Sequence, residues 1–284
     1  MIKSYKFKRQ LNDIIIYVVL SVTGIIWISP LIWMVLHSFR AEGLSDVMYL
    51  IPKHFTLDNY IKLFTDTKTF DYPRWFLNTL FVAVCSCIIS TLAVLMVSYS
   101  FSRLRFKARK PFINIGMILG MFPGFMTMIA IYYLLKAMNL TQTLFALIIC
   151  YSAGAGLGYQ ISKGFFDTIP RALDEAAKID GANKNQIFWK IILPMSRPII
   201  VYTILTSFLG PWCDFILARL IMVDKLDYFT VAIGLEKMID KEFKLNFFKQ
   251  FLAGSVVVAT PITLLFLKMQ SYYVSGVTAG GVKG

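Results

Sequence analysis

The charged segment "EAAKIDGANKNQIFWKIILP" (Glu175–Pro194) lies between two long apolar runs and gathers carboxylates, amines and amides at close spacing. It contains no His, Cys or Ser. Its acids do not form the convergent pair of carboxylates that general acid–base catalysis would need. These residue types can make ion pairs, helix caps and contacts with a partner. The pattern therefore predicts a contact surface and no catalytic residue.

The other residues that commonly carry chemistry are isolated from one another. His37 and His54 lie at or beyond a predicted membrane edge, and two lone histidines do not make a metal site. The cysteines lie inside apolar runs and resemble buried small hydrophobes more than a disulfide or metal framework. They are Cys85, Cys87, Cys150 and Cys213. We expect no metal on this chain.

Nucleotide binding is not predicted either. The chain has no Gly-x-x-x-x-Gly-Lys-Ser/Thr loop, whose backbone amides and lysine hold phosphates. The glycine-rich "GAGLG" (Gly154–Gly158) lacks the spacing of a dinucleotide-binding loop and lies inside an apolar run. We expect no cofactor to be bound by this chain.

The composition explains why the charged segment stands out. The 284 residues are 57% hydrophobic and 16% charged, whereas soluble domains carry about 25% charged residues. The net charge of +13 could suggest nucleic acid, but the basic residues lie between apolar runs and not on one soluble domain. The sequence therefore predicts an all-α polytopic membrane protein in contact with lipid and without nucleic acid.

Six apolar runs have the length of a membrane helix, which needs roughly 20 residues. They are continuous and do not alternate, which argues against a closed barrel. The expected spans are Ile14–Leu36, Trp75–Tyr99, Phe112–Leu135, Thr143–Ile161, Pro198–Leu217 and Phe251–Tyr272.

The short loops set the orientation, because cytoplasmic loops are rich in Lys and Arg. "RLRFKARK" (Arg103–Lys110) holds five basic residues and no acid, whereas the short loop after the third span holds only Lys136. Both termini and the charged segment are then cytoplasmic. The expected organisation is an N-terminus (1–13), a six-span domain (14–272) and a C-terminal tail (273–284). Within the six-span domain we expect outer loops at 39–74 and 218–250 and a cytoplasmic loop at 162–197.

Helix breakers and small residues mark a candidate gate or pathway within the spans. Pro30, Pro123, Pro211 and Pro261 should each kink a span. Gly116, Gly120 and Gly124 are spaced by four and predict a flat helix face, either for ordinary packing or for a pathway between two subunits. Asp214 is the one acid in a predicted span, with Arg219 as its expected partner, in a structural, gating or substrate-contacting role. The candidate residues are Gly120, Pro123, Gly124, Trp212 and Asp214.

The charged segment itself is predicted to form two short helices joined at a glycine. Pro170 suits the first turn of a helix, and Gly181 should end that helix in left-handed geometry. Asn183 and Gln186 have the spacing of a capping box for the next helix, which Pro194 is expected to end. The segment could be a solvated connector, an amphipathic helix on lipid or a docking element.

The pattern in this segment resembles the EAA loop of permease subunits in binding-protein-dependent ABC importers. The matching residues are Glu175-Ala176-Ala177, Asp180-Gly181-Ala182, Phe188, Ile191, Leu193-Pro194 and Pro198. Five further stretches are similar to the sugar-importer branch with its MalG-type permeases: "FTLDNY" (55–60), "NTL" (78–80), "YSFSRLRFKARK" (99–110), "MFP" (121–123) and "VTAGGVKG" (277–284). Cys213 in "WCDF" and Ala172 depart from the commoner pattern.

The resemblance implies a type I ABC importer permease fold, with a cytoplasmic coupling helix, in a prokaryotic cytoplasmic membrane. It also implies a heterodimer with a second homologous permease, two cytoplasmic ATPase subunits that hold ATP and Mg, and an extracytoplasmic solute-binding protein. The chain itself would be a non-catalytic translocation subunit. The ATPase-docking residues implied are Arg171, Asp174, Glu175, Ala176, Ala177, Asp180, Gly181 and Ala182, with Thr278, Gly280, Gly281 and Lys283 in an ATPase-interface tail.

The expected cargo is a carbohydrate, either maltodextrin or another oligosaccharide. A second possibility is the same architecture importing another solute such as glycerol phosphate, which would favour Arg or Lys facing the cavity. A third is an ion-driven secondary transporter, which would need coupling carboxylates near the middle of the membrane. Asp214 alone is a poor candidate for that role.

Overall fold

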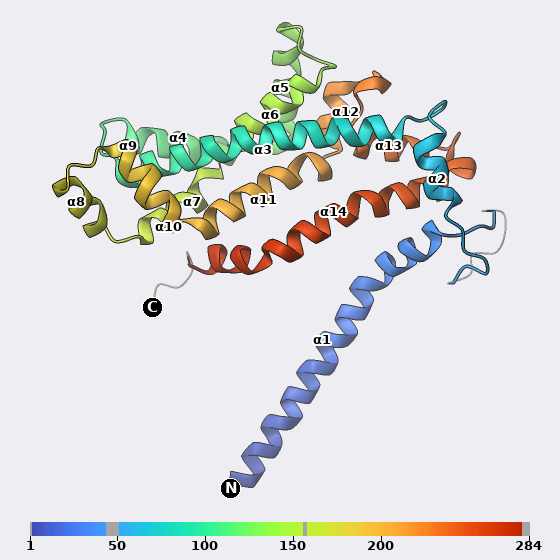
Figure 1. Ribbon diagram of the computed structural model, residues 1–284, viewed down its shortest axis with the longest axis horizontal. Helices are drawn as coiled ribbons and strands as arrows, with labels where there is room; N and C mark the ends of the chain where they lie inside the picture. Colours follow the sequence, from blue (N-terminus) through green and yellow to red (C-terminus); the bar gives the residue numbers. More distant parts are fainter. Residues whose placement is uncertain (1, 44–50, 156–157, 280–284) are drawn as a thin grey trace. The chain divides into compact units, whose positions relative to one another are not determined.

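The computed structural model describes residues 2–43, 51–155 and 158–279, and most of these residues are helical (Figure 1). Within these ranges the β-structure is limited to one bridge, between Arg40 and Phe55. Helices satisfy their own backbone groups, which a chain built for lipid requires. The predicted all-α class is confirmed.

Three helices are long and apolar enough to cross a membrane. They lie in α1 (Ile2–Ser38), α3 (Tyr72–Arg103) and α14 (Lys244–Ala279). Three bent helix pairs meet the same criterion together, so up to six spans are present in the described chain if each pair counts as one. The paired segments are Arg109–Gly120 with Gly124–Ala137, Leu144–Gly154 with Tyr159–Thr168, and Lys184–Met195 with Arg197–Cys213.

The chain divides into two compact units, and the end of α1 is fixed within the first one. This unit comprises Met1–Phe70 and Lys237–Val257. The buried amide of Asn59, on α2 (Asp58–Thr65), donates to the carbonyl oxygens of Ser38 and Arg40, both at 2.9 Å. These bonds explain the asparagine of the "FTLDNY" stretch, because its amide ties α2 to the chain that follows α1.

The second unit is built around α3 and comprises Asp71–Glu236 and Val258–Gly284. The side chain of Asp71 accepts the Arg74 N–H at 3.2 Å and so caps the start of α3. The buried face of α3 is rich in small residues spaced by three or four, which lets other helices approach closely. These include Thr79, Ala83, Ser86, Ser90 and Ser98.

Three helices pack against α3 in this unit: α6 (Leu144–Ala155), α7 (Tyr159–Thr168) and α11 (Arg197–Cys213). The hydroxyl of Ser98 donates to the carbonyl oxygen of Tyr159 at 3.0 Å, and the Cys87 thiol lies 3.5 Å from the carbonyl oxygen of Ile204. The contacts join α3 to α7 and α11 through short side chains. α3 is therefore the element that positions the others.

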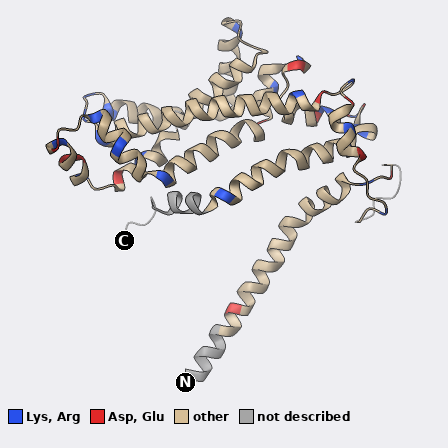
Figure 2. Ribbon diagram, viewed as in Figure 1, with Lys and Arg blue, Asp and Glu red and all other residues tan. Residues whose placement is uncertain are grey.

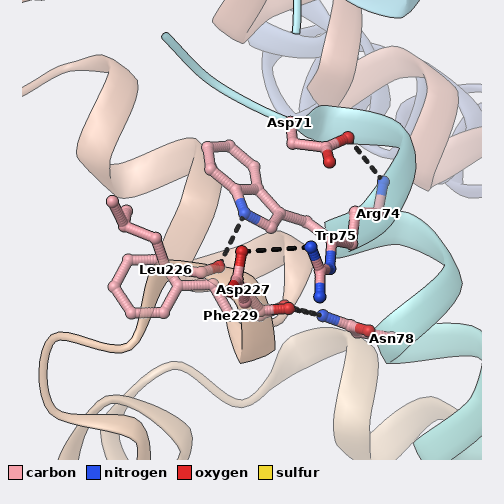
Figure 3. A network of polar contacts seen from close by, with 7 residues as sticks. All are labelled: Asp71, Arg74, Trp75, Asn78, Leu226, Asp227 and Phe229. Atoms are coloured by element: carbon pink, nitrogen blue, oxygen red, sulfur yellow. Dashed lines mark hydrogen bonds and ion pairs between the residues drawn. The ribbon is translucent and has the colours of Figure 1, made fainter. Parts of the chain in front are cut away.

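The predicted outer loop 218–250 contains ordered helices. It includes most of α12 (Ile216–Met222), and then η3 (Leu226–Tyr228) and α13 (Val231–Met238). Figure 3 shows how the first turns of α3 hold η3 in place. The Trp75 indole N–H donates to the Leu226 carbonyl oxygen at 3.2 Å, and the Asn78 amide donates to two more backbone carbonyls, at 2.9 and 3.0 Å. Asn78, from the "NTL" stretch, thus satisfies the backbone of a turn distant in sequence.

Candidate functional site

The charged segment folds as two short helices around a glycine corner. The first is α8 (Ala172–Ile179), and Gly181 follows it with φ at +85°. The Ala182 N–H donates to the Ala177 carbonyl oxygen at 2.9 Å, and the Gly181 N–H donates to the Lys178 carbonyl oxygen at 3.1 Å. These two bonds form the Schellman arrangement that ends many helices. The predicted left-handed glycine is confirmed.

A capping box starts the second helix, α9 (Lys184–Ile187), as predicted. The Asn183 side chain accepts the Gln186 N–H at 2.9 Å, and the Gln186 side chain accepts the Asn183 N–H at 2.8 Å. Backbone donors that would otherwise be unpaired are thereby satisfied on the far side of the corner. The angle between α8 and α9 is therefore held by hydrogen bonds on both sides: backbone–backbone bonds at the end of α8 and side chain–backbone bonds at the start of α9.

The helical run ends at Met195, one residue after Pro194, so the predicted end is correct to within one residue. A π-helical turn over Phe188–Ile192 leads into α10 (Leu193–Met195), and the chain bends by 84° before α11. In the wider turn the Leu193 N–H bonds to the Phe188 carbonyl oxygen. Such local widening lets a helix pass a residue that lacks an N–H donor.

Apolar packing fixes this second helix to the rest of its unit. Ile187, Phe188 and Ile192 are buried in one cluster with Tyr99 of α3. The Tyr99 ring centroid lies 4.8 Å from that of Phe188, and its hydroxyl donates to the Lys184 carbonyl oxygen at 3.2 Å. These contacts join this helix directly to α3.

A buried ion pair fixes α8 to the end of α3. Arg103 Nη1 lies 3.1 Å from Asp174 Oδ2, and both side chains are nearly buried. Arg103 Nη2 also donates to the carbonyl oxygens of Phe166 and Ile169, each at 2.7 Å. Asp174 was expected to contact an ATPase, but it points into this chain because Arg103 holds it there. Ala177 is likewise buried.

The exposed face of α8 differs from the expected docking set. Leu173, Ala176 and Ile179 are spaced by three, which places them on one helical face. All three are exposed, and Ile179 is 87% exposed although it is apolar. The sequence reasoning missed Leu173 and Ile179, although their spacing within "LDEAAKI" was a visible signal. Of the expected residues, Arg171, Glu175, Ala176, Asp180 and Gly181 are exposed and Ala182 is half-buried.

A cleft of about 400 Å³ opens between the end of α3, α8 and α9. Figure 2 shows Lys and Arg gathered in this region, whereas the middle of α3 carries no charge. Glu175 was expected to dock on an ATPase, and its surroundings in this chain are already cationic. The charged lining residues are Arg103, Arg105, Arg171, Lys178 and Lys184, with Asp174 and Glu175.

Asp214 lies at the break between α11 and α12, and its expected partner is wrong. The Tyr151 hydroxyl donates to Asp214 Oδ2 at 2.7 Å, and two backbone N–H groups of α12 donate to its carboxylate at 3.2 and 3.3 Å. The carboxylate is thus used to cap α12. Arg219 instead pairs with Asp224 at 3.5 Å. Trp212, which precedes the break, is buried, with its ring 5.1 Å from a phenylalanine ring of α3.

The glycines expected on one face do not share a helix. α4 (Arg109–Gly120) ends before Pro123 and α5 (Gly124–Ala137) begins after it, with a bend of 102° between them. The predicted stripe from Gly116 to Gly124 is therefore wrong, because the proline and its neighbours break the helix instead of kinking it. A Cβ atom on Gly116 would lie 3.2 Å from the Tyr159 hydroxyl, whereas Gly120 and Gly124 have open space within 4 Å.

Part of the predicted tail is helical. The helix α14 continues past the expected end of the sixth span to Ala279, so Thr278 is helical. Gly280, Gly281 and Lys283 lie outside the described residues. Their contact with an ATPase stays a prediction.

The α8 corner lies within the part of the chain that matches a family of known proteins. The family model of the binding-protein-dependent transport system inner membrane component matches residues 89–275, which include α8 and its corner. The galactooligosaccharides transport system permease protein GanQ of Bacillus subtilis (strain 168) is 33% identical over 285 residues and 100% of each chain. The maltodextrin transport system permease protein MalD of Streptococcus pneumoniae (strain ATCC BAA-255 / R6) is 34% identical over 287 residues, again over 100% of each chain.

A solved structure has the same fold. A bacterial ABC transporter involved in the import of the acidic polysaccharide alginate contains a chain that matches with a TM-score of 0.81. The match covers 93% of this chain and 97% of that one, at 20% sequence identity. The predicted ABC importer permease fold is thereby confirmed. This chain belongs to the family of binding-protein-dependent transport system inner membrane components.

Proposed function

We propose that this chain is a translocation subunit of an ATP-driven importer for a neutral oligosaccharide of the maltodextrin type. The observation that carries the proposal is the full-length similarity to permeases that are named for maltodextrin and galactooligosaccharides. The geometry of the glycine corner supports it. α8 exposes an apolar face, and its buried side is fixed to α3. A helix that transmits movement from a partner to the membrane spans needs both a free face and such an attachment.

The proposed assembly contains a second homologous permease, two cytoplasmic ATPase subunits and an extracytoplasmic solute-binding protein. ATP and Mg are held by the ATPase subunits, and hydrolysis takes place there. The face of Leu173, Ala176 and Ile179 docks on an ATPase. Arg103 and the Tyr99 contacts then carry the movement of that subunit to the end of α3, which switches the pathway between the two sides of the membrane.

The proposed topology places both termini and the α8–α9 corner in the cytoplasm. The regions 39–74 and 218–250 are then extracytoplasmic and available to the solute-binding protein. The C-terminal residues Thr278, Gly280, Gly281 and Lys283 extend the ATPase interface. The basic loop Arg103–Lys110 supports this orientation, because short cytoplasmic loops are rich in Lys and Arg.

The two alternatives raised by the sequence are less well supported. A phosphorylated solute needs cations in its path, and a cavity of about 330 Å³ between α3, α6, α7 and α11 has no charged lining among the described residues. An ion-driven transporter needs a carboxylate that binds and releases its ion. Asp214 is instead engaged by Tyr151 and by two backbone N–H groups.

The direct test is to express this chain with the neighbouring genes for a second permease, an ATPase and a solute-binding protein, and to reconstitute the purified complex in liposomes. We expect ATP-dependent uptake of labelled maltotriose or a related neutral oligosaccharide, and none of glycerol 3-phosphate. Uptake of glycerol 3-phosphate alone would favour the second solute class. Uptake that follows an ion gradient without ATP would contradict the proposal.

A further inference from the structure

A cavity of about 330 Å³ lies within the second unit, between α3, α6, α7 and α11. Its volume is within the range of small-ligand sites, about 300–1,000 Å³. Its lining combines hydroxyl groups with small and apolar residues, and no charged side chain is among the described residues that form it. The hydroxyls belong to Tyr151, Ser162, Tyr202, Thr203, Thr206 and Ser207.

Most of these hydroxyls already donate a hydrogen bond within the protein. The Thr203 hydroxyl donates to the Ile199 carbonyl oxygen at 2.8 Å, and the Thr206 hydroxyl donates to the Tyr202 carbonyl oxygen at 3.0 Å. Tyr151 gives its proton to a carboxylate, at 2.7 Å. Because Thr203 is a donor elsewhere, Ser162 is the donor in the 3.3 Å contact between their two hydroxyls.

A hydroxyl that donates its proton still has a lone pair with which it can accept. The cavity therefore presents mainly hydrogen-bond acceptors, with no cation to attract an anion. A phosphate or carboxylate would bring further acceptors and negative charge, which is unfavourable in such a lining. A neutral polyol brings several O–H donors. The C–H face of a sugar ring can also pack on the aromatic rings of Tyr151 and Tyr202, with burial of apolar surface.

We propose that this cavity is a carbohydrate subsite, which this subunit itself contributes to the translocation pathway. The inference rests on the proposed function and deepens it, because it assigns sugar contact to residues of α6, α7 and α11. Thr206 and Ser207 accept or share hydrogen bonds with the hydroxyls of one sugar unit. Gly158 and Gly210 line the cavity, and a Cβ atom at either position would meet no atom within 4 Å, so a larger side chain there has open space to occupy.

Ligand protection of an introduced cysteine tests binding directly. The chain carries Ser207→Cys in a version without native cysteines, within the assembled complex, and its reaction with a water-soluble maleimide is timed. We expect maltotriose to slow the labelling in a saturable way, by about sixfold at five times its Kd, and glycerol 3-phosphate to have no effect. The matched control is Gln160→Cys, on α7 but outside the cavity lining, where the sugar should not change the rate.

Sugar uptake by two variants of the cavity lining is the second test of the subsite. Thr206→Val removes one hydroxyl at nearly constant shape and should raise the KM for maltotriose uptake about two- to tenfold. Gly158→Leu fills the cavity and should lower uptake by at least about tenfold, a loss comparable to a mispositioned substrate. Gly164→Leu is the control, because it also adds a side chain in open space on α7 but does not line the cavity. Co-purification with the second permease checks assembly of each variant.

The outcomes separate the subsite from the proposed function. In one outcome the wild type imports maltotriose, but the sugar does not protect the Ser207→Cys thiol and the transport variants keep the wild-type KM and rate. The subsite is then wrong, and the importer assignment stands. If the wild type imports no oligosaccharide, the proposed function fails. In that case protection of the introduced thiol by maltotriose would still support a sugar site, and absence of protection would overturn both.

Discussion

Gly234 has a steric reason to be glycine. A Cβ atom at this position would lie 1.9 Å from Cε3 of Trp75, whose indole is almost fully buried. The hydrogen bond from the indole N–H to the Leu226 carbonyl oxygen holds the ring in place. The close approach joins α13 to the start of α3, and the ring cannot move away without breaking that bond.

Gly234→Ala should therefore destabilise the protein. Overpacking of a filled site costs about 1–3 kcal/mol, and for a chain of this size about 1 kcal/mol corresponds to roughly 2–4 °C in the unfolding midpoint. The measurement is the thermal unfolding midpoint of the purified complex in detergent. Gly164→Ala, which meets no atom within 4 Å, is the control. Equal midpoints for the two variants would contradict the packing argument.

Single residues also show where sequence reasoning failed. The partner expected for Asp214 was Arg219 because the two are close in sequence, but the structure brings in Tyr151, which is 63 positions away. A hydrogen bond across such a distance depends on how α6 and α11 pack, and no local pattern records it. The left-handed geometry of Gly181 was predictable because it depends on the adjoining helix alone.

Among the elements, α8 depends on α3 more than its own sequence suggests. Its two ends are set locally by the glycine corner and the capping box, whose residues are within a few positions of one another. Its attachment is not local, because Arg103 stands 71 positions before Asp174. The sequence placed Arg103 in a basic loop and Asp174 on a docking face. In the structure the two charges neutralise each other inside the protein.

Breaking this ion pair should cost far more than breaking an exposed one. Arg103→Ala leaves Asp174 buried and unpaired and removes donors from two carbonyls, a loss of about 3–5 kcal/mol. The control is Arg74→Ala, because Arg74 pairs with Asp227 at a similar 3.0 Å but both side chains are about half exposed or more, so that the loss is about 0–1 kcal/mol. Both variants are compared by unfolding of the complex.

A second comparison separates charge burial from packing. The double variant Arg103→Met with Asp174→Leu removes both charges and keeps an apolar filling, so it should be more stable than Arg103→Ala alone. A double variant that is as unstable as the single one would show that the carbonyl bonds of Arg103, and not its charge, hold α8.

At the scale of the whole molecule, the sequence predicted the membrane class and the number of apolar runs but not their shape. α3 and α14 contain the expected second and sixth spans and extend beyond them. The third span is broken by 102° at Pro123, and the fifth ends at Cys213 instead of Leu217. Proline predicts a disturbed helix, but the size of the bend depends on neighbours that only packing supplies.

The orientation of the molecule can be tested by cysteine labelling in intact cells, in a background without native cysteines. Cysteines at positions 62 and 237 should react with an impermeant reagent, because both lie in regions proposed to be extracytoplasmic. A cysteine at position 184, next to the capping box, should react only after the membrane is permeabilised. Reaction of position 184 in intact cells would contradict the six-span orientation.

The central claim is that the glycine corner after α8 couples ATP hydrolysis to sugar import. The most direct measurement is the amount of maltodextrin imported per ATP hydrolysed by the complex in liposomes, for wild type, Gly181→Val and Gly181→Asn. Valine at φ +85° costs roughly 1–2 kcal/mol in strain and turns the chain away from α9, whereas asparagine tolerates left-handed geometry. We predict that the valine variant assembles and hydrolyses ATP but imports little sugar, while the asparagine variant stays close to wild type. Wild-type import by Gly181→Val would contradict the account.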